Sequence, residues 1–159
     1  MSSKVKFVGL DEIKILIDSS QILVSYSPLG DEIRPIDFSI IKDFSGLVVA
    51  IPNKNFPDPF DYSIWLKKYC GKRKTVVLIP GQQFDLFGTR YGRGGGWYDR
   101  LLSQLPNDWL RIGLAKNKRI VRCRLPHQPH DEPVDWLIGR VANGWRAFET
   151  KARTNPAVD

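Results

Sequence analysis

The sequence is poor in the residues that build metal centres, disulfide frameworks and membrane spans. It has two cysteines in 159 residues, Cys70 and Cys123, and no CxxC pair. This count excludes a cysteine-based zinc site or a disulfide framework, and we expect two buried free thiols. No window approaches the roughly 18 uncharged apolar residues of a membrane span, and the N-terminus has no apolar signal-peptide core. We therefore expect a cytoplasmic protein.

The composition is that of an ordinary folded domain. Hydrophobic residues make up 42% and charged residues 26% of the chain, which excludes a disordered or collagen-like protein. The length suits a single domain, which we place at residues 1–150, followed by a frayed tail at 151–159. We expect a monomer.

The charge is strongly positive and predicts an anionic partner. The net charge is +7 and the isoelectric point is about 9.5. Basic residues cluster at 67–74 and again at 116–124, which would suit a nucleic acid or a polyphosphate. The first cluster is equally well explained as the solvated end of a helix.

Hydrophobic periodicity predicts alternating helices and strands. Helical spacing or helix signals are found at 10–19, 37–44, 59–70 and 97–105. Strands are predicted at 22–26, 46–52, 75–80, 110–115, 120–125 and 134–139.

Two of these strands fix the fold class. GLVVAIP at 46–52 and TVVLIP at 75–80 show no polar alternation, which is typical of strands buried on both faces, and a helix separates them. This is the pattern of a βαβ unit. The sequence predicts a three-layer α/β fold: an open, mainly parallel, Rossmann-like sheet with helices on both faces.

The stretch GTRYGRGGGWYDR at 88–100 is the most informative segment of the chain. It follows a buried strand and precedes a helix, where open α/β sheets bind ligands. Glycines allow backbone N–H groups to approach a phosphate closely, and Arg90 and Arg93 carry forked donors that match phosphate oxygens. The stretch therefore predicts a bound polyphosphate, although it fits neither the Walker A pattern nor the dinucleotide fingerprint.

Residue by residue, the stretch resembles the 5-formyltetrahydrofolate cyclo-ligase family, also called methenyltetrahydrofolate synthetases. The matching motif is Pro80-Gly81, Phe84-Asp85, Gly88, Arg90, Gly92, Gly94, Gly96, Trp97, Tyr98 and Asp99. Further along, His130-Asp131 and Val134-Asp135 resemble the end of the family pattern, and YSPLGDEIRPIDF at 26–38 resembles its start. The resemblance covers about residues 10–140.

The resemblance implies an ATP- and Mg²⁺-dependent ring closure of 5-formyltetrahydrofolate to 5,10-methenyltetrahydrofolate through a phosphorylated formyl group. It implies the nucleotide-binding residues Arg90, Gly92, Arg93, Gly94, Gly95, Gly96, Trp97 and Tyr98. Arg93 and Tyr98 would also be catalytic, and with Glu32 they would bind the folate substrate. Asp99 and Asp131 would hold the metal.

Each acidic or aromatic candidate also has a purely structural explanation. Asp99 could complement a helix dipole, Asp131 could be a turn residue, and Glu32 could be a solvated surface acid. Trp97 and Tyr98 could be core residues.

The chain also departs from the family pattern. Only MSSKVKF precedes the first predicted helix, where the family has a helix with a basic cluster, and the segment between the strands at 46–52 and 75–80 is short. Two alternatives stay open: a relative with reduced activity that binds nucleotide as a regulator, and a basic module that binds polyanions or nucleic acid. The pair Asp99 and Asp131 separates them, because a metal-free anion site gains nothing from carboxylates.

Overall fold

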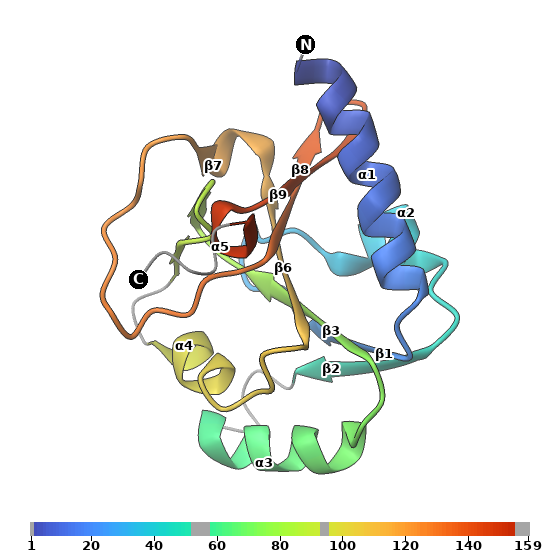
Figure 1. Cartoon of the computed structure of the whole chain (residues 1–159), viewed down its shortest axis with the longest axis vertical. Helices are drawn as coiled ribbons and strands as arrows, with labels where there is room; N and C mark the ends of the chain where they lie inside the picture. The colour runs from blue at the N-terminus through green and yellow to red at the C-terminus, as the bar shows by residue number, and fades with distance from the viewer. Residues whose placement is uncertain (1, 52–57, 93–95, 155–159) are drawn as a thin grey trace.

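The computed structural model is built around a six-stranded sheet with the order β2-β1-β3-β6-β8-β9 (Figure 1). It describes residues 2–51, 58–92 and 96–154, with only the backbone of residues 2–9, 51, 153 and 154. Neighbouring strands are parallel except β8 and β9, which are antiparallel. The strands are β1 (Ile22–Tyr26), β2 (Leu47–Ile51), β3 (Thr75–Pro80), β6 (Leu110–Lys116), β8 (Trp136–Val141) and β9 (Gly144–Glu149).

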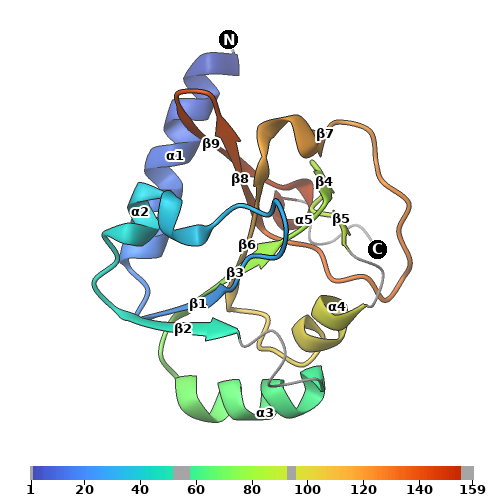
Figure 2. The same ribbon diagram turned by 180° about the vertical axis from the view of Figure 1, so that it is seen from behind.

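Helices cover both faces of this sheet, so the predicted three-layer α/β fold is confirmed. On one face lie α1 (Ser2–Asp18), the short 3₁₀ helix η1 (Pro35–Asp37) and α2 (Ser39–Lys42). On the other lie α3 (Pro59–Cys70) and α4 (Trp97–Leu102), as Figures 1 and 2 show. A further short helix, α5 (Lys151–Thr154), follows β9, where a frayed tail was predicted.

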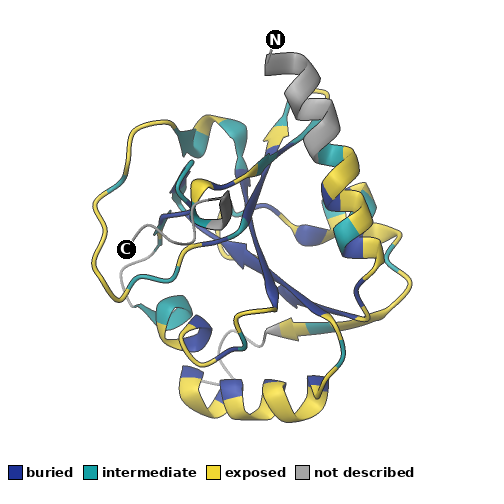
Figure 3. Ribbon diagram, in the orientation of Figure 1, coloured by how far each residue is buried: buried dark blue, intermediate teal, exposed yellow. Residues whose placement is uncertain are grey.

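Alternation along the strands divides the apolar side chains between two cores. Val77 of β3 packs with Tyr62 and Leu66 of α3, whereas the adjacent Val76 packs with Ile13 of α1 on the opposite face. Successive strand residues point to opposite faces, so a strand covered on both sides needs an unbroken apolar run. β3 is buried at all six positions, as its sequence predicts. Figure 3 shows the central strands as the most deeply buried part of the molecule.

The helix signals were accurate for α3. The Asp58 side chain accepts a hydrogen bond from the Phe60 amide at 2.9 Å, and Pro59 occupies the first helical position. Gly71 ends the helix with a φ of 57°. At α1, however, the predicted start at Leu10 was wrong, because the backbone is helical from Ser2. A single glycine such as Gly9 costs about 1 kcal/mol in a helix and does not end it.

The strand predictions failed at the sheet edges. Within the described residues β2 is an edge strand that pairs with β1 alone. Leu47 and Val48 are 46% and 56% exposed, so the prediction of burial on both faces was wrong. β9 was missed altogether, although Asn143-Gly144 at the start of β9 is a hairpin signal. An apolar run indicates a strand but does not reveal whether a neighbour covers it.

The predicted strand at 120–125 is mostly loop. Only Ile120–Val121 forms a strand, β7, in a second small sheet with β4 (Gln83–Asp85) and β5 (Arg90–Tyr91). Residues 122–135, the long loop, then run without regular structure to β8. Cys123 lies in this loop and is exposed, so the expectation of two buried thiols holds only for Cys70, whose pKa burial raises. Likewise α4 ends at Leu102 rather than at Leu105.

No helix in the described part of the chain is both long and apolar enough to span a membrane.

Asp85 attaches the long loop to the second sheet. Its carboxylate is fully buried and accepts hydrogen bonds from the amides of Phe87 at 2.9 Å and Thr89 at 3.0 Å. A third bond comes from the amide of Leu125 at 2.7 Å. Three N–H donors satisfy a buried carboxylate, as burial of a charge requires. Asp85 therefore connects the turn before β5 to the long loop.

Replacement of Asp85 by Asn should destabilise the protein by about 2 kcal/mol. The Asn amide group would face backbone donors with a donor of its own, leaving a buried N–H without an acceptor. Urea unfolding measures the change. Asp58→Asn is the control, because Asn caps a helix as well as Asp does. Equal stability of the two variants would contradict this role of Asp85.

Candidate functional site

Arg90 lies at the carboxyl end of β3, where a ligand site was predicted. Its Nε donates a hydrogen bond of 2.5 Å to the carbonyl oxygen of Pro80, the last residue of β3. The guanidinium lies over the ring of Tyr98, 4.7 Å from the ring centroid. Burial lowers the pKa of Arg90, and the nearby Tyr98, Asp99 and Glu32 oppose this effect. Arg90 thus brings three other predicted site residues into one electrostatic environment.

At two positions of the predicted stretch, the structure shows why the residue is a glycine: a side chain would collide with a neighbouring group. A Cβ on Gly92 would lie 2.5 Å from Nη1 of Arg90, so glycine leaves space for the guanidinium. Gly88 has a φ of 85°, and a Cβ there would lie 2.4 Å from the carbonyl oxygen of Val134. Gly96 directly precedes α4 with a left-handed φ of 67°. Arg93, Gly94 and Gly95 lie outside the described residues.

Trp97 and Tyr98 both pack against the core. The centroid of the Trp97 ring lies 6.2 Å from that of the Tyr62 ring and 5.2 Å from that of the Tyr98 ring. Burial raises the pKa of Tyr98 above its ordinary value, although Arg90 opposes the shift. Tyr98 is therefore a neutral phenol near pH 7, suited to donate a hydrogen bond and not to act as a base.

Glu32 comes from the N-terminal half of the chain and lies near Arg90 and Tyr98. It lies half-buried in the connection from β1 to η1, and its Oε1 accepts a hydrogen bond of 2.8 Å from the Leu29 amide. Its charge contributes to the raised pKa values of Tyr98 and Tyr26, after burial in each case. Glu32 thus lies close enough to both tyrosines to affect their ionisation.

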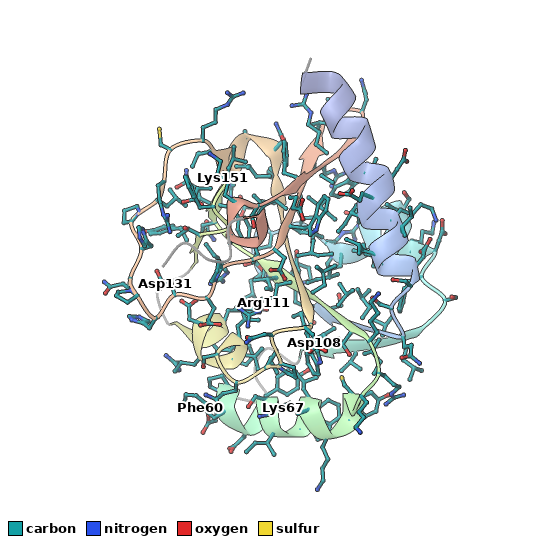
Figure 4. All side chains as sticks on the ribbon, in the orientation of Figure 1. Phe60, Lys67, Asp108, Arg111, Asp131 and Lys151 are labelled. Atoms are coloured by element: carbon teal, nitrogen blue, oxygen red, sulfur yellow. The ribbon has the colours of Figure 1, made fainter. Side chains whose placement is uncertain are left out.

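Asp99 reaches the segment that carries Asp131. Its Oδ1 accepts a hydrogen bond of 3.0 Å from the amide of Glu132, which is the nitrogen of the Asp131–Glu132 peptide bond. Asp131 accepts a hydrogen bond of 2.8 Å from the Gln128 amide, so it also shapes a turn. Figure 4 shows Asp131 on the long loop where it passes beside α4.

Two carboxylates are enough protein ligands for a magnesium ion that is bound together with a phosphate. Among the described residues there is no group of three or more His, Cys, Asp or Glu side chains arranged to hold a metal. Mg²⁺, however, commonly takes only one or two protein carboxylates and completes its shell with water and phosphate oxygens. Asp99 and Asp131 supply that number.

Arg111 and Glu132 were not predicted as site residues. Arg111 on β6 has only 8% of its side-chain surface exposed, and its Nη1 contacts Oε1 of Glu132 at 2.9 Å. Its Nη2 donates a hydrogen bond of 2.9 Å to the carbonyl oxygen of Leu102, the last residue of α4. The available signal was a single arginine in the otherwise apolar strand LRIGLA, which implies a buried charge with a specific partner.

Comparison with known proteins identifies the family. The sequence model of the 5-formyltetrahydrofolate cyclo-ligase family matches residues 31–139. A 5-formyltetrahydrofolate cyclo-ligase of Mycolicibacterium smegmatis is 28% identical over 74 residues, covering 46% of this chain and 38% of the relative. A mitochondrial 5-formyltetrahydrofolate cyclo-ligase of Arabidopsis thaliana is 32% identical over 72 residues, covering 40% of this chain and 26% of the relative. The matches thus span less than two fifths of the length of each relative.

A solved structure supports the fold. A 5,10-methenyltetrahydrofolate synthetase from Mycoplasma pneumoniae superposes with a TM-score of 0.55 at 19% identity, covering 80% of this chain and 79% of the other. The family match contains Glu32, Arg90, Tyr98, Asp99 and Asp131 and extends over more than half of the chain. The chain therefore belongs to the 5-formyltetrahydrofolate cyclo-ligase family.

Proposed function

We propose that this protein converts 5-formyltetrahydrofolate and ATP into 5,10-methenyltetrahydrofolate, ADP and phosphate. The family match supports the reaction, and the contact between Asp99 and the Asp131–Glu132 peptide supports the site. The γ-phosphoryl group passes from ATP to the formyl oxygen, breaking the bond to the bridging oxygen of ADP. The second folate nitrogen then bonds to the formyl carbon and loses its proton, while the carbon–oxygen bond breaks and phosphate leaves.

The formyl oxygen is a poor nucleophile, so catalysis depends on alignment and on neutralisation of phosphate charge. Arg90 supplies a cation fixed between the Pro80 carbonyl and the Tyr98 ring. Its forked donors suit phosphate oxygens. In this proposal Arg93 and the glycines at 92–96 complete the phosphate contacts. Asp99 and Asp131 hold Mg²⁺, which neutralises phosphate charge when bound.

Glu32 and Tyr98 serve the folate side of the site. A carboxylate accepts hydrogen bonds and suits the N–H groups of a pterin ring, and a neutral phenol donates one. The shared electrostatic environment of Glu32, Tyr98 and Arg90 supports a substrate bound between them, with its formyl group toward the arginine.

The first expected outcome is a magnesium-dependent response to ATP. MgATP should raise the melting temperature, by an amount that grows with ligand concentration, and ATP with a chelator should do so much less. Addition of 5-formyltetrahydrofolate should then produce the ultraviolet absorbance of the methenyl product. MgATP binding without product would favour the nucleotide-binding regulator. Stabilisation by polyanions that is insensitive to the chelator would favour the polyanion module.

Asp99→Asn should reduce turnover by at least 100-fold and raise the magnesium concentration needed for half-maximal rate. The amide retains an oxygen that can accept the Glu132 N–H bond, but it lacks the negative charge that attracts the ion. Asp108→Asn is the matched control, since Asp108 is exposed on the turn after α4. Steady-state rates at several magnesium concentrations test this, and a fully active Asp99→Asn enzyme would remove Asp99 from the metal site.

Tyr98→Phe should raise KM for the folate about tenfold and leave the melting temperature nearly unchanged. Phenylalanine keeps the packing and the contact with Arg90 but removes the hydroxyl donor. The loss of one hydrogen bond to the substrate weakens binding by about tenfold. Since the pKa of Tyr98 is raised, its ionisation should not appear in the wild-type pH–rate profile below pH 10. A basic limb near pH 8 that disappears in Tyr98→Phe would show that the phenol acts as an acid or base.

A further inference from the structure

Arg111 is a buried charge whose donors are divided among several acceptors. Nη1 contacts Oε1 of Glu132 at 2.9 Å and the carbonyl oxygen of Pro133 at 3.5 Å. Nη2 donates to the carbonyl oxygen of Leu102 at 2.9 Å. A charge with 8% of its side-chain surface exposed is costly unless it is paired and hydrogen-bonded. Buried ion pairs are weak sources of stability but can fix a specific geometry.

The backbone of Arg111 fixes the end of the same loop. Its amide donates to Oδ2 of Asp135 at 2.9 Å, and its carbonyl accepts from the Asp135 amide at 2.8 Å. β6 therefore holds the long loop immediately before β8, through main chain and side chain together.

These contacts form a continuous chain that starts at the first turn of α4 and returns to its last residue. Asp99, in the first turn of α4, accepts the amide hydrogen bond of Glu132, and the carboxylate of Glu132 contacts Arg111. Arg111 returns to α4 at its last residue, Leu102. Both ends of a six-residue helix and the adjoining loop are thus fixed to one strand. Figure 4 shows Arg111 between α4 and the loop that carries Asp131.

We infer that Arg111 is a positioning residue for the metal-binding acids, acting through Glu132 on the placement of Asp99 and Asp131. This inference rests on the proposed function of those two acids. The Arg111 side chain itself contacts Glu132, Pro133 and Leu102. It holds Glu132, which follows Asp131 in the chain and whose amide binds Asp99, so that the two carboxylates can share one ion.

Arginine is required because its planar guanidinium directs two nitrogens to separate acceptors at fixed angles. A lysine ammonium is a single point charge and cannot bridge Leu102 and Glu132 in the same geometry. Arg111→Lys therefore keeps the charge and removes the bridge, and Glu132→Gln keeps an acceptor oxygen and the backbone amide but removes the counter-charge.

The test is a titration of Mg²⁺ against protein saturated with ATP, followed by melting temperature and by calorimetry. Both variants should need 10–100-fold more Mg²⁺ for half-saturation, the usual loss when a residue that orients metal ligands is changed. ATP affinity in the presence of a chelator should change less than twofold. Arg140→Lys is the control, since Arg140 on β8 is half-exposed and pairs with Asp37 at 3.5 Å, away from the acids; it should titrate like the wild type.

Two results would overturn the inference. One is wild-type magnesium affinity in Glu132→Gln, the milder variant, whether or not Arg111→Lys folds. The other is equal loss of ATP binding with and without Mg²⁺, which would show a merely structural role. A wild-type protein whose ATP binding does not respond to Mg²⁺ would instead refute the proposed function, and the inference with it.

Discussion

The hydrogen bond from the Glu132 amide to the Asp99 carboxylate holds together two segments that are 33 residues apart in the sequence. One is a six-residue helix and the other is a loop without regular structure. Neither could define the position of an acidic side chain alone, because a short helix and a bare loop have few internal contacts. The proposed metal site depends on this contact.

The long loop is held by polar side chains instead of a hydrophobic face. Asp85 binds the Leu125 amide, Asp99 binds the Glu132 amide, and Arg111 contacts the side chain of Glu132. All three come from elements fixed by one of the two sheets or by the apolar core. Buried polar groups with several partners each specify one geometry more sharply than apolar contacts do. These polar contacts thus place the residues of the proposed site.

The sequence predicted the centre of the fold and the place of Arg90 within it. Unbroken apolar runs predicted β1 and β3, and capping signals predicted both ends of α3. The glycine and arginine stretch predicted Arg90 at the carboxyl end of β3, since parallel strands present their loops at one edge. In contrast, periodicity does not reveal which strand has a neighbour, so the exposure of β2 could not be predicted.

Long-range polar partners were also beyond the reach of the sequence. The packing roles of Trp97 and Tyr98 were among the alternatives, but the contact of Tyr98 with Arg90 was not predicted. Glu132 looks like any loop acid in HDEPVD, and only its contacts with Asp99 and Arg111 distinguish it. A hydrogen bond between residues so far apart leaves no pattern in one sequence.

A crystal structure with ATP and Mn²⁺, analysed by anomalous difference density, tests the central claim most directly. We expect one strong manganese peak within about 2.5 Å of carboxylate oxygens of both Asp99 and Asp131, with a phosphate oxygen completing the shell and Arg90 on the triphosphate. A manganese peak bound by neither acid, or a triphosphate far from Arg90, would contradict the account.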